Sequence, residues 1–210
     1  MKKKRSYSSN RWLSEHFRDV YVKHTHLCGI RSRAWFKLDQ INLKYNIFKR
    51  SAYVLDLGSS PGSWSQYAIK KIGNKGLVIA CDINPMIKIK GVFFLHGDIT
   101  KPEVFQSLLD ILKSRKIDLV MSDMSPNITG ISSIDIPNAF SLSNFALNIT
   151  LKILSNTGVF LIKIFQGEKF KNYLNKIRSI FKIVKICKPH ASRNRSRELF
   201  ILAMNKKNNF

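Results

Sequence analysis

The sequence predicts one α/β domain in which helices cover both faces of a mostly parallel, seven-stranded sheet. From Tyr53 onward, short apolar runs alternate with stretches of helical periodicity, a pattern typical of parallel strands joined by crossover helices. A turn that contains Gly58 and Gly62 directly follows the first run, as expected where a strand passes into a helix beside a ligand site. The 210 residues, 1–210, match the length of a single domain.

The first part of the chain, residues 1–50, is predicted to be a basic helical cap on a core that spans residues 51–205. Apolar residues recur at helical spacing over residues 11–24 and again over residues 31–45, which predicts two amphipathic helices. Their apolar positions are Trp12, Phe17, Val20, Trp35, Phe36, Leu38 and Ile41.

The core contains seven apolar runs of strand length. In chain order, they are Tyr53–Leu57, Leu77–Asp82, Val92–His96, Asp118–Ser122, Val159–Phe165, Ile183–Cys187 and Leu199–Met204. No internal repeat accompanies them, which excludes solenoid and propeller folds.

The turn after the first strand reads Asp56-Leu57-Gly58-Ser-Ser-Pro-Gly62-Ser-Trp64. A dinucleotide site needs the spacing G-x-G-x-x-G, and the third glycine is missing here, which disfavours a nicotinamide dehydrogenase. S-adenosylmethionine has no phosphates and needs close backbone approach together with polar groups that contact its ribose, adenine and amino-acid parts. The turn therefore favours this cofactor, with Gly58 and Gly62 giving the close approach. Trp64 fits either a cofactor contact or core packing.

Four of the nine aspartates lie at or just past successive strand ends: Asp56, Asp82, Asp98 and Asp123. Each alone is explained as well by capping a helix or a turn. Together they predict a cofactor site, because the carboxyl ends of parallel strands meet at one edge of a sheet. There Asp82 is expected to accept hydrogen bonds from the ribose hydroxyls, and Asp98 to face the adenine amino group.

Five separated motifs occur along the chain. They are Arg31-Ser-Arg-Ala-Trp-Phe-Lys37-Leu, the turn Asp56 to Trp64, Met121-Ser-Asp123-Met-Ser-Pro126-Asn, Ile162-Lys163-Ile-Phe-Gln-Gly167 and Ser192-Arg-Asn-Arg-Ser-Arg-Glu198. Their order resembles the FtsJ/RrmJ family, the bacterial large-subunit ribosomal RNA uridine 2′-O-methyltransferases also called RlmE. The resemblance implies a Rossmann-like, S-adenosylmethionine-dependent methyltransferase fold whose last strand is antiparallel and lies beside the fifth.

The same resemblance implies the functional residues. The catalytic set it implies is Lys37, Asp123, Lys163 and Glu198, and the cofactor contacts are Gly62, Trp64, Asp82, Asp98 and Asp123. One departure is visible, because serines stand at positions 59, 60 and 63, where the family commonly has alanines and a further glycine.

The four catalytic candidates suit methyl transfer to a ribose hydroxyl, which is a poor nucleophile until its proton is removed. Lys163 lies in an apolar run that would partly desolvate its ammonium, and a nearby Lys37 would further favour the neutral amine. Asp123 is expected to orient Lys163, the cofactor or both, and Glu198 to have a supporting role. The alternatives are solvent-exposed lysines, and a salt bridge between Glu198 and nearby arginines.

The composition favours a polyanionic partner, which the resemblance specifies as ribosomal RNA in the large subunit. There are 36 Lys and Arg against 13 Asp and Glu, a formal net charge of +23. The excess of 25 Lys over 11 Arg also fits a genome rich in A and T, so arginines are the more informative candidates for RNA binding. The candidates are Lys2, Lys3, Lys4, Arg5, Arg11, Arg31, Arg33, Arg193, Arg195 and Arg197.

Two other functions remain open at this stage. One is a methyltransferase of the same fold that acts on transfer RNA or a messenger cap, and the other is a non-catalytic RNA-binding module in ribosome assembly. Cys28, Cys81 and Cys187 are too few and too far apart for a disulfide framework or a metal site, so a reducing cytoplasm is expected. We find neither a secretory signal nor a run of apolar residues long enough to span a membrane.

Overall fold

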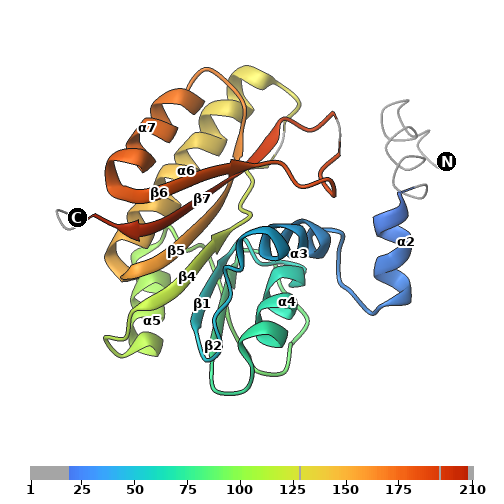
Figure 1. Ribbon diagram of the computed structural model, residues 1–210, viewed down its shortest axis with the longest axis vertical. Coiled ribbons are helices and arrows are strands. Elements are labelled where there is room, and N and C mark those ends of the chain that lie inside the picture. Colours follow the sequence, from blue (N-terminus) through green and yellow to red (C-terminus); the bar gives the residue numbers. More distant parts are fainter. Residues whose placement is uncertain (1–18, 128, 194, 208–210) are drawn as a thin grey trace.

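A seven-stranded sheet lies at the centre of the computed structural model, which describes residues 19–127, 129–193 and 195–207 (Figure 1). The strands are β1 (Tyr53–Leu57), β2 (Leu77–Asp82), β3 (Val92–His96), β4 (Ile117–Ser122), β5 (Leu154–Phe165), β6 (Phe181–Cys187) and β7 (Glu198–Lys206). They are arranged in the order β3-β2-β1-β4-β5-β7-β6, and β7 is antiparallel to both of its neighbours. The predicted fold class is confirmed, including the last strand beside the fifth.

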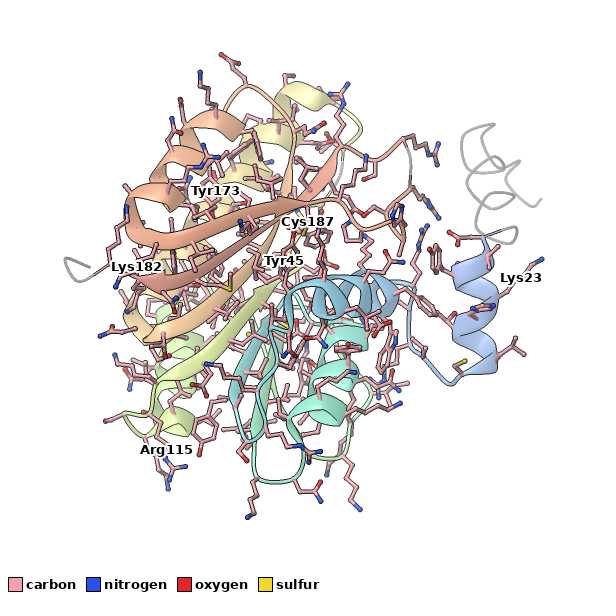
Figure 2. The ribbon with its side chains drawn as sticks, viewed as in Figure 1. Lys23, Tyr45, Arg115, Tyr173, Lys182 and Cys187 are labelled. Atoms are coloured by element: carbon pink, nitrogen blue, oxygen red, sulfur yellow. The ribbon has the colours of Figure 1, made fainter. Side chains whose placement is uncertain are left out.

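Six helices are described. They are α2 (Val20–Leu27), α3 (Ala34–Tyr45), α4 (Ser63–Ile72), α5 (Pro102–Leu112), α6 (Ser132–Ile153) and α7 (Phe170–Ile180). Helix α2 lies beside the body of the molecule, and its Lys23 points outward (Figure 2). Asp19 caps α2 by accepting a hydrogen bond from the Tyr21 backbone N–H at 3.0 Å. Of the helix predicted over residues 11–24, residues 11–18 lie outside the described part, and α2 continues to Leu27.

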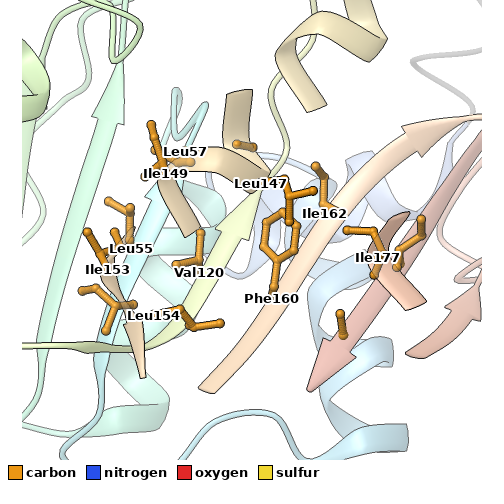
Figure 3. Close-up of a cluster of buried hydrophobic side chains, with 14 of the residues drawn as sticks. Leu55, Leu57, Val120, Leu147, Ile149, Ile153, Leu154, Phe160, Ile162 and Ile177 are labelled. Atoms are coloured by element: carbon orange, nitrogen blue, oxygen red, sulfur yellow. The ribbon is translucent and has the colours of Figure 1, made fainter. Parts of the chain in front are cut away.

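The two faces of the sheet bury separate groups of side chains, because neighbouring residues of a strand point to opposite faces. Val54 of β1 packs with residues of α3 and α4, whereas Leu55 packs with residues of α5, α6 and α7. Figure 3 shows Phe160 of β5 meeting Leu147 of α6 and Ile177 of α7 on the second face. Helices therefore cover both faces, as predicted.

This alternation also places the functional side chains. Lys163 follows Leu161 by two residues on β5, and Glu198 precedes Phe200 by two residues on β7. Leu161 and Phe200 both belong to the group packed under α3 and α4. Lys163 and Glu198 consequently point to the face on which α3 lies, at the edge where the parallel strands end.

The main difference from the predicted strands is at the start of β5. The strand begins at Leu154, five residues before the predicted Val159, because Leu154 pairs with Ile117 of β4. The residues between Leu154 and Val159 are polar or glycine, and the pairing is irregular between Ile117 and Leu119. A segment of polar residues and glycine has no alternation of apolar and polar residues, so the sequence did not indicate a strand there.

Within the part of the chain that the structure describes, no helix is both long enough and apolar enough to cross a membrane.

Candidate active site

The turn after β1 is held in a conformation that requires glycine. Gly58 has φ +74° and Gly62 has φ +104°, in the region that residues with a Cβ rarely adopt. A Cβ at Gly58 would lie 2.8 Å from the backbone N and Cα of Met124, so the turn directly contacts the segment after β4. Hydrogen bonds from the Gly58 N–H to the Cys81 carbonyl (2.9 Å) and from the Ser60 N–H to Asp82 Oδ2 (2.8 Å) tie the turn to β2.

A cavity of about 490 Å³ opens at the carboxyl ends of β1, β2 and β4 and beyond β3. Gly58, Asp82, Asp98 and Asp123 all line it, so the structure brings together four of the predicted cofactor residues. A smaller cavity of about 220 Å³ adjoins it and shares Gly58, Ser60 and Asp123 with it. Trp64 lines this smaller cavity together with Ser32, Ala34, Ser59, Pro61 and Ser63.

Two of the three acids that line the larger cavity, Asp82 and Asp98, can accept further hydrogen bonds from a ligand. Asp82 accepts one backbone hydrogen bond on each oxygen, from Ser60 at 2.8 Å and from Asn84 at 2.7 Å. Asp98 accepts on Oδ1 from the Thr100 hydroxyl and N–H, and these bonds hold the pKa of the Asp98 carboxyl below its usual range. A carboxylate oxygen accepts about two hydrogen bonds, so Asp82 and Asp98 can still accept the hydroxyl and amino donors of S-adenosylmethionine. The residues present fit that cofactor.

Asp56 differs from the other three aspartates. Its side chain is completely buried and accepts a 2.6 Å hydrogen bond from the Ser65 hydroxyl on Oδ2. Oδ1 has no hydrogen-bond partner among the described residues. Burial is the largest cause that raises the pKa of Asp56, the like charges of Asp123 and Asp82 add to it, and the hydrogen bond from Ser65 opposes it, with a net value of about 7. Asp56 lines neither of the two cavities, so its position is beneath the cofactor turn.

Trp64 fits the core-packing interpretation and also borders a cavity. The indole is only 2% exposed, its ring packs against that of Phe200 at 5.9 Å between centroids, and Nε1 donates to the Ala34 carbonyl at 2.9 Å. It is therefore a core residue, and it also forms a wall of the smaller cavity. A cofactor contact by Trp64 stays a prediction.

Four charged side chains gather next to these cavities. Lys163 Nζ lies 2.9 Å from Asp123 Oδ1 and donates to the Asp123 carbonyl oxygen at 2.8 Å. Lys37 Nζ, presented by α3, lies 2.6 Å from Glu198 Oε1. On the sheet, Lys163 is opposite Phe200 and Glu198 is opposite Phe165, so Lys163 and Glu198 are diagonal neighbours on one face. The structure thus places all four predicted catalytic residues together.

The charges of this group are paired. Burial alone would raise the pKa of Glu198, but the charge and hydrogen bond of Lys37 and the charge of Lys163 hold it below its usual value. Glu198 is therefore an anion that balances Lys37. Glu198 forms a salt bridge with Lys37. The side chains of Lys163 and Lys37 are 8% and 13% exposed, so both ion pairs are largely shielded from water.

Arg31 has contacts that the sequence did not predict. Its guanidinium donates to three backbone carbonyls, those of Pro61 (2.9 Å), Ile87 (2.6 Å) and Lys88 (3.1 Å). These bonds connect the cofactor turn to the segment after β2. Backbone carbonyls have no signature in the sequence, so no pattern could have revealed them. RNA binding by Arg31 stays a prediction beside this structural contact.

The arginine-bearing loop between β6 and β7 packs against α3. Arg33 forms an ion pair with Asp19 and donates to the Ala191 carbonyl, and Gln40 accepts a hydrogen bond from the Ala191 N–H at 3.0 Å. Arg193, Arg195 and Arg197 follow in the same loop, just before Glu198. The RNA-binding candidates Lys2, Lys3, Lys4, Arg5 and Arg11 lie outside the described residues.

A family model described as FtsJ-like methyltransferase matches residues 30–206. The chain belongs to the FtsJ-like methyltransferase family. A curated relative named ribosomal RNA large subunit methyltransferase E, from Buchnera aphidicola subsp. Schizaphis graminum, is 53% identical over 201 residues. The match covers 96% of this chain and 98% of the relative. The family resemblance stated from the five motifs is confirmed.

Solved structures agree with this membership. A crystal structure from Plasmodium falciparum, provisionally described as a ribosomal RNA methyltransferase, has a TM-score of 0.77 and 29% identity, and the match covers 84% of this chain and 98% of that one. A provisionally described rRNA methylase from Clostridium thermocellum has a TM-score of 0.55 and 15% identity, with 81% and 97% coverage. At that identity the second likeness concerns the fold alone.

Proposed function

We propose that this chain methylates the 2′-hydroxyl of a uridine ribose in large-subunit ribosomal RNA, with S-adenosylmethionine as methyl donor. The observation that carries the proposal is the group of Lys37, Asp123, Lys163 and Glu198 beside a cavity that Asp82 and Asp98 line. Family membership supports methyl transfer, and the name of the 53% identical relative supports the RNA substrate. The proposed location is the cytoplasm, on RNA that is part of a ribosomal particle.

The cofactor is assigned to the two adjoining cavities. Asp82 would accept from the ribose hydroxyls and Asp98 from the adenine amino group in the larger cavity. The turn at Gly58 and the wall at Trp64 would hold the amino-acid part in the smaller one, which Asp123 also borders. Gly62 lies beside Arg31, Met86 and Ile89 and lines neither cavity, so a cofactor contact at Gly62 stays a prediction. When bound, S-adenosylmethionine supplies a methyl group on a sulfonium, an electrophile that needs no metal for activation.

The protein must hold the ribose and take up the hydroxyl proton. We assign proton removal to Lys163 Nζ, which the Asp123 carboxylate and carbonyl hold in one position. The Asp123 carboxylate, 2.9 Å from Nζ, would stabilise the ammonium that results from the proton transfer. Lys37 is assigned to hold the ribose or the developing charge, and Glu198 to keep Lys37 in place.

The arginines of the loop before Glu198, together with Arg33, would contact RNA phosphates. Arg193, Arg195 and Arg197 lie in the chain within a few residues of Glu198, so phosphates bound there are next to the reacting ribose. Phosphate contacts give affinity without sequence readout. The choice of nucleotide therefore has to come from RNA shape or from contacts with a base.

The proposal is tested with large ribosomal subunits purified from cells that lack this chain. Incubation with the protein and methyl-labelled S-adenosylmethionine should give a 2′-O-methyluridine in the nuclease digest, identified by mass spectrometry. Transfer RNA and capped messenger RNA are the matched alternative substrates. Labelling of either one instead of the subunit would replace the proposed substrate, and binding of the subunit without labelling of any RNA would favour the non-catalytic module.

A further inference from the structure

A third cavity, of about 300 Å³, lies directly beside the catalytic group. It shares Ser125 and Pro126 with the 490 Å³ cavity, so these two residues form a common wall. Two of its other chain segments adjoin a predicted catalytic residue, and the third is Asp135, Ile136 and Ala139 of α6. Phe165 and Gln166 follow Lys163 by two and three residues, and Arg197 directly precedes Glu198. A ribose held at Lys163 would therefore have this cavity as one neighbour.

The ring of Phe165 connects the catalytic group to the cavity. Lys163 Nζ lies 5.7 Å from the centre of that ring, and Phe165 also lines the cavity. A hydrogen bond of 2.9 Å from the Gln166 N–H to the Arg197 carbonyl joins the end of β5 to the arginine-bearing loop. The two segments of wall that carry Gln166 and Arg197 are thus fixed relative to Lys163.

The walls combine apolar surface with a few polar groups. Pro126, Ile136, Ala139 and Phe165 provide the apolar part, and Asp135, Gln166, Arg195 and Arg197 provide polar side chains. Asp135 is occupied by hydrogen bonds from Thr129 and the Gly130 N–H, whereas Gln166 and Arg197 are exposed at the rim. An aromatic or apolar wall with donors and acceptors at the rim is the kind of surface that receives an unstacked base of single-stranded RNA.

We propose that this cavity receives the base of the nucleotide whose ribose is methylated, and that its walls select a uracil. The amide of Gln166 offers a donor and an acceptor side by side, and Arg197 offers only donors. Such a set matches the acceptor, donor and acceptor groups along the edge of uracil. The inference rests on the proposed function, because it takes the ribose of an RNA nucleotide as the group held at Lys163.

The first test fills the cavity. Ala139 lines it and is buried, and Ser141 is exposed two residues further along α6, so Ala139→Leu and Ser141→Leu are matched variants. We expect Ala139→Leu to lower kcat/KM on large subunits by about tenfold or more, since a stacked base contributes roughly 1–3 kcal/mol. Its affinity for S-adenosylmethionine and its melting temperature should match those of Ser141→Leu. Full activity of a folded Ala139→Leu protein would contradict the proposal.

The second test uses an exposed residue, so that folding is not at issue. Subunits carrying uridine or adenosine at the mapped position are compared as substrates for the wild-type protein and for Gln166→Ala. The ratio of kcat/KM for the uridine subunit over the adenosine subunit should fall at least about fivefold in Gln166→Ala. If Gln166 contacts the base, the effect of replacing Gln166 depends on which base is present. An unchanged ratio would contradict base selection by this cavity. If the wild-type protein does not label the uridine subunit at all, the proposed function has failed, and the two failures are thereby distinguished.

Discussion

Lys163 occupies a buried position beside a carboxylate. Its side chain is 8% exposed, and Asp123 Oδ1 lies 2.9 Å from its Nζ. The sequence led us to expect a second cation, Lys37, close to Lys163. In the structure, Glu198 Oε1 lies 2.6 Å from Lys37 Nζ and balances its charge. The four candidate catalytic residues consequently form two lysine–carboxylate ion pairs.

Replacing Lys163 with Arg separates a base from a positive charge, because a guanidinium cannot release its proton at any usable pH. If Lys163 removes the proton, Lys163→Arg and Lys163→Ala should both lose about 10²- to 10⁴-fold in kcat. Calorimetric titration should show that both variants still bind S-adenosylmethionine. A Lys163→Arg protein that keeps much of its activity would instead identify Lys163 as an electrostatic clamp and direct attention to Asp123.

Asp56 makes stability depend on pH in a predictable direction. Burial raises its pKa to about 7, from an ordinary value of 3.8, so the folded protein binds a proton that the unfolded chain releases between these values. The stability from this group is complete below the unfolded pKa and is lost as pH rises through about 7, by an amount on the order of 4 kcal/mol. Asp56→Asn, which cannot ionise, should therefore become more stable relative to wild type between about pH 5 and about pH 8. Urea unfolding at both pH values measures this, and a constant difference would show that Asp56 does not titrate there.

At the level of elements, the cofactor turn depends on contacts from outside its own strand and helix. Arg31 lies between α2 and α3, and its guanidinium holds the carbonyl of Pro61 together with those of Ile87 and Lys88. Gln66 of α4 donates to the Gly29 carbonyl at 2.9 Å in the same region. The junction between α2 and α3 is therefore part of the support of the cofactor site.

We expect Arg31→Ala to weaken S-adenosylmethionine binding by about tenfold, since three hydrogen bonds from a charged donor are lost at an exposed site. Arg31→Lys should restore only part of the affinity, because an ammonium lacks the planar spread of donors that reaches three carbonyls. Calorimetry with the cofactor and a salt titration with RNA give the two readouts. If Arg31→Ala binds the cofactor normally but its RNA affinity depends less on salt concentration, Arg31 is an RNA contact, as the sequence suggested.

Strands and their order were the most predictable elements. Apolar runs located β1, β2 and β3 at their observed bounds. The signal is strongest for β1 and β2, because parallel strands buried on both faces have continuous apolar sequences. The four polar or glycine positions that follow Leu154 at the start of β5 carried no such signal. The four candidate catalytic residues came from the family resemblance, whereas the ion pair of Lys37 with Glu198 depends on how α3 packs on the sheet. The 300 Å³ cavity was not foreseen, since α6 and the arginine-bearing loop meet only in the folded chain.

For the whole molecule, net charge is a poor guide to where RNA binds. The formal charge is +23, and Lys23, Arg115 and Lys182 lie on different sides of the structure (Figure 2). Position relative to the catalytic group is more informative. The loop that carries Arg193, Arg195 and Arg197 ends at Glu198, at the carboxyl edge of the sheet.

The triple replacement of Arg193, Arg195 and Arg197 by Ala should lower RNA affinity and flatten its dependence on salt. Fewer phosphates are then neutralised, so RNA binding releases fewer counterions. The matched control replaces Lys23, Arg115 and Lys182, which removes the same charge elsewhere. Binding of large-subunit RNA is measured by filter retention over a series of salt concentrations. Equal slopes for the two triple variants would show that the loop has no special part in RNA binding.

The central claim is that this chain places a methyl group on a ribose of large-subunit RNA through Lys163. The most direct measurement maps 2′-O-methylation by mass spectrometry in ribosomal RNA from cells without the chain, with the wild-type chain restored, and with Lys163→Ala restored. We predict that one uridine of the large-subunit RNA loses its methyl group without the chain, regains it with the wild type, and stays unmethylated with Lys163→Ala. An unchanged methylation pattern in the large-subunit RNA of cells without the chain would contradict the account.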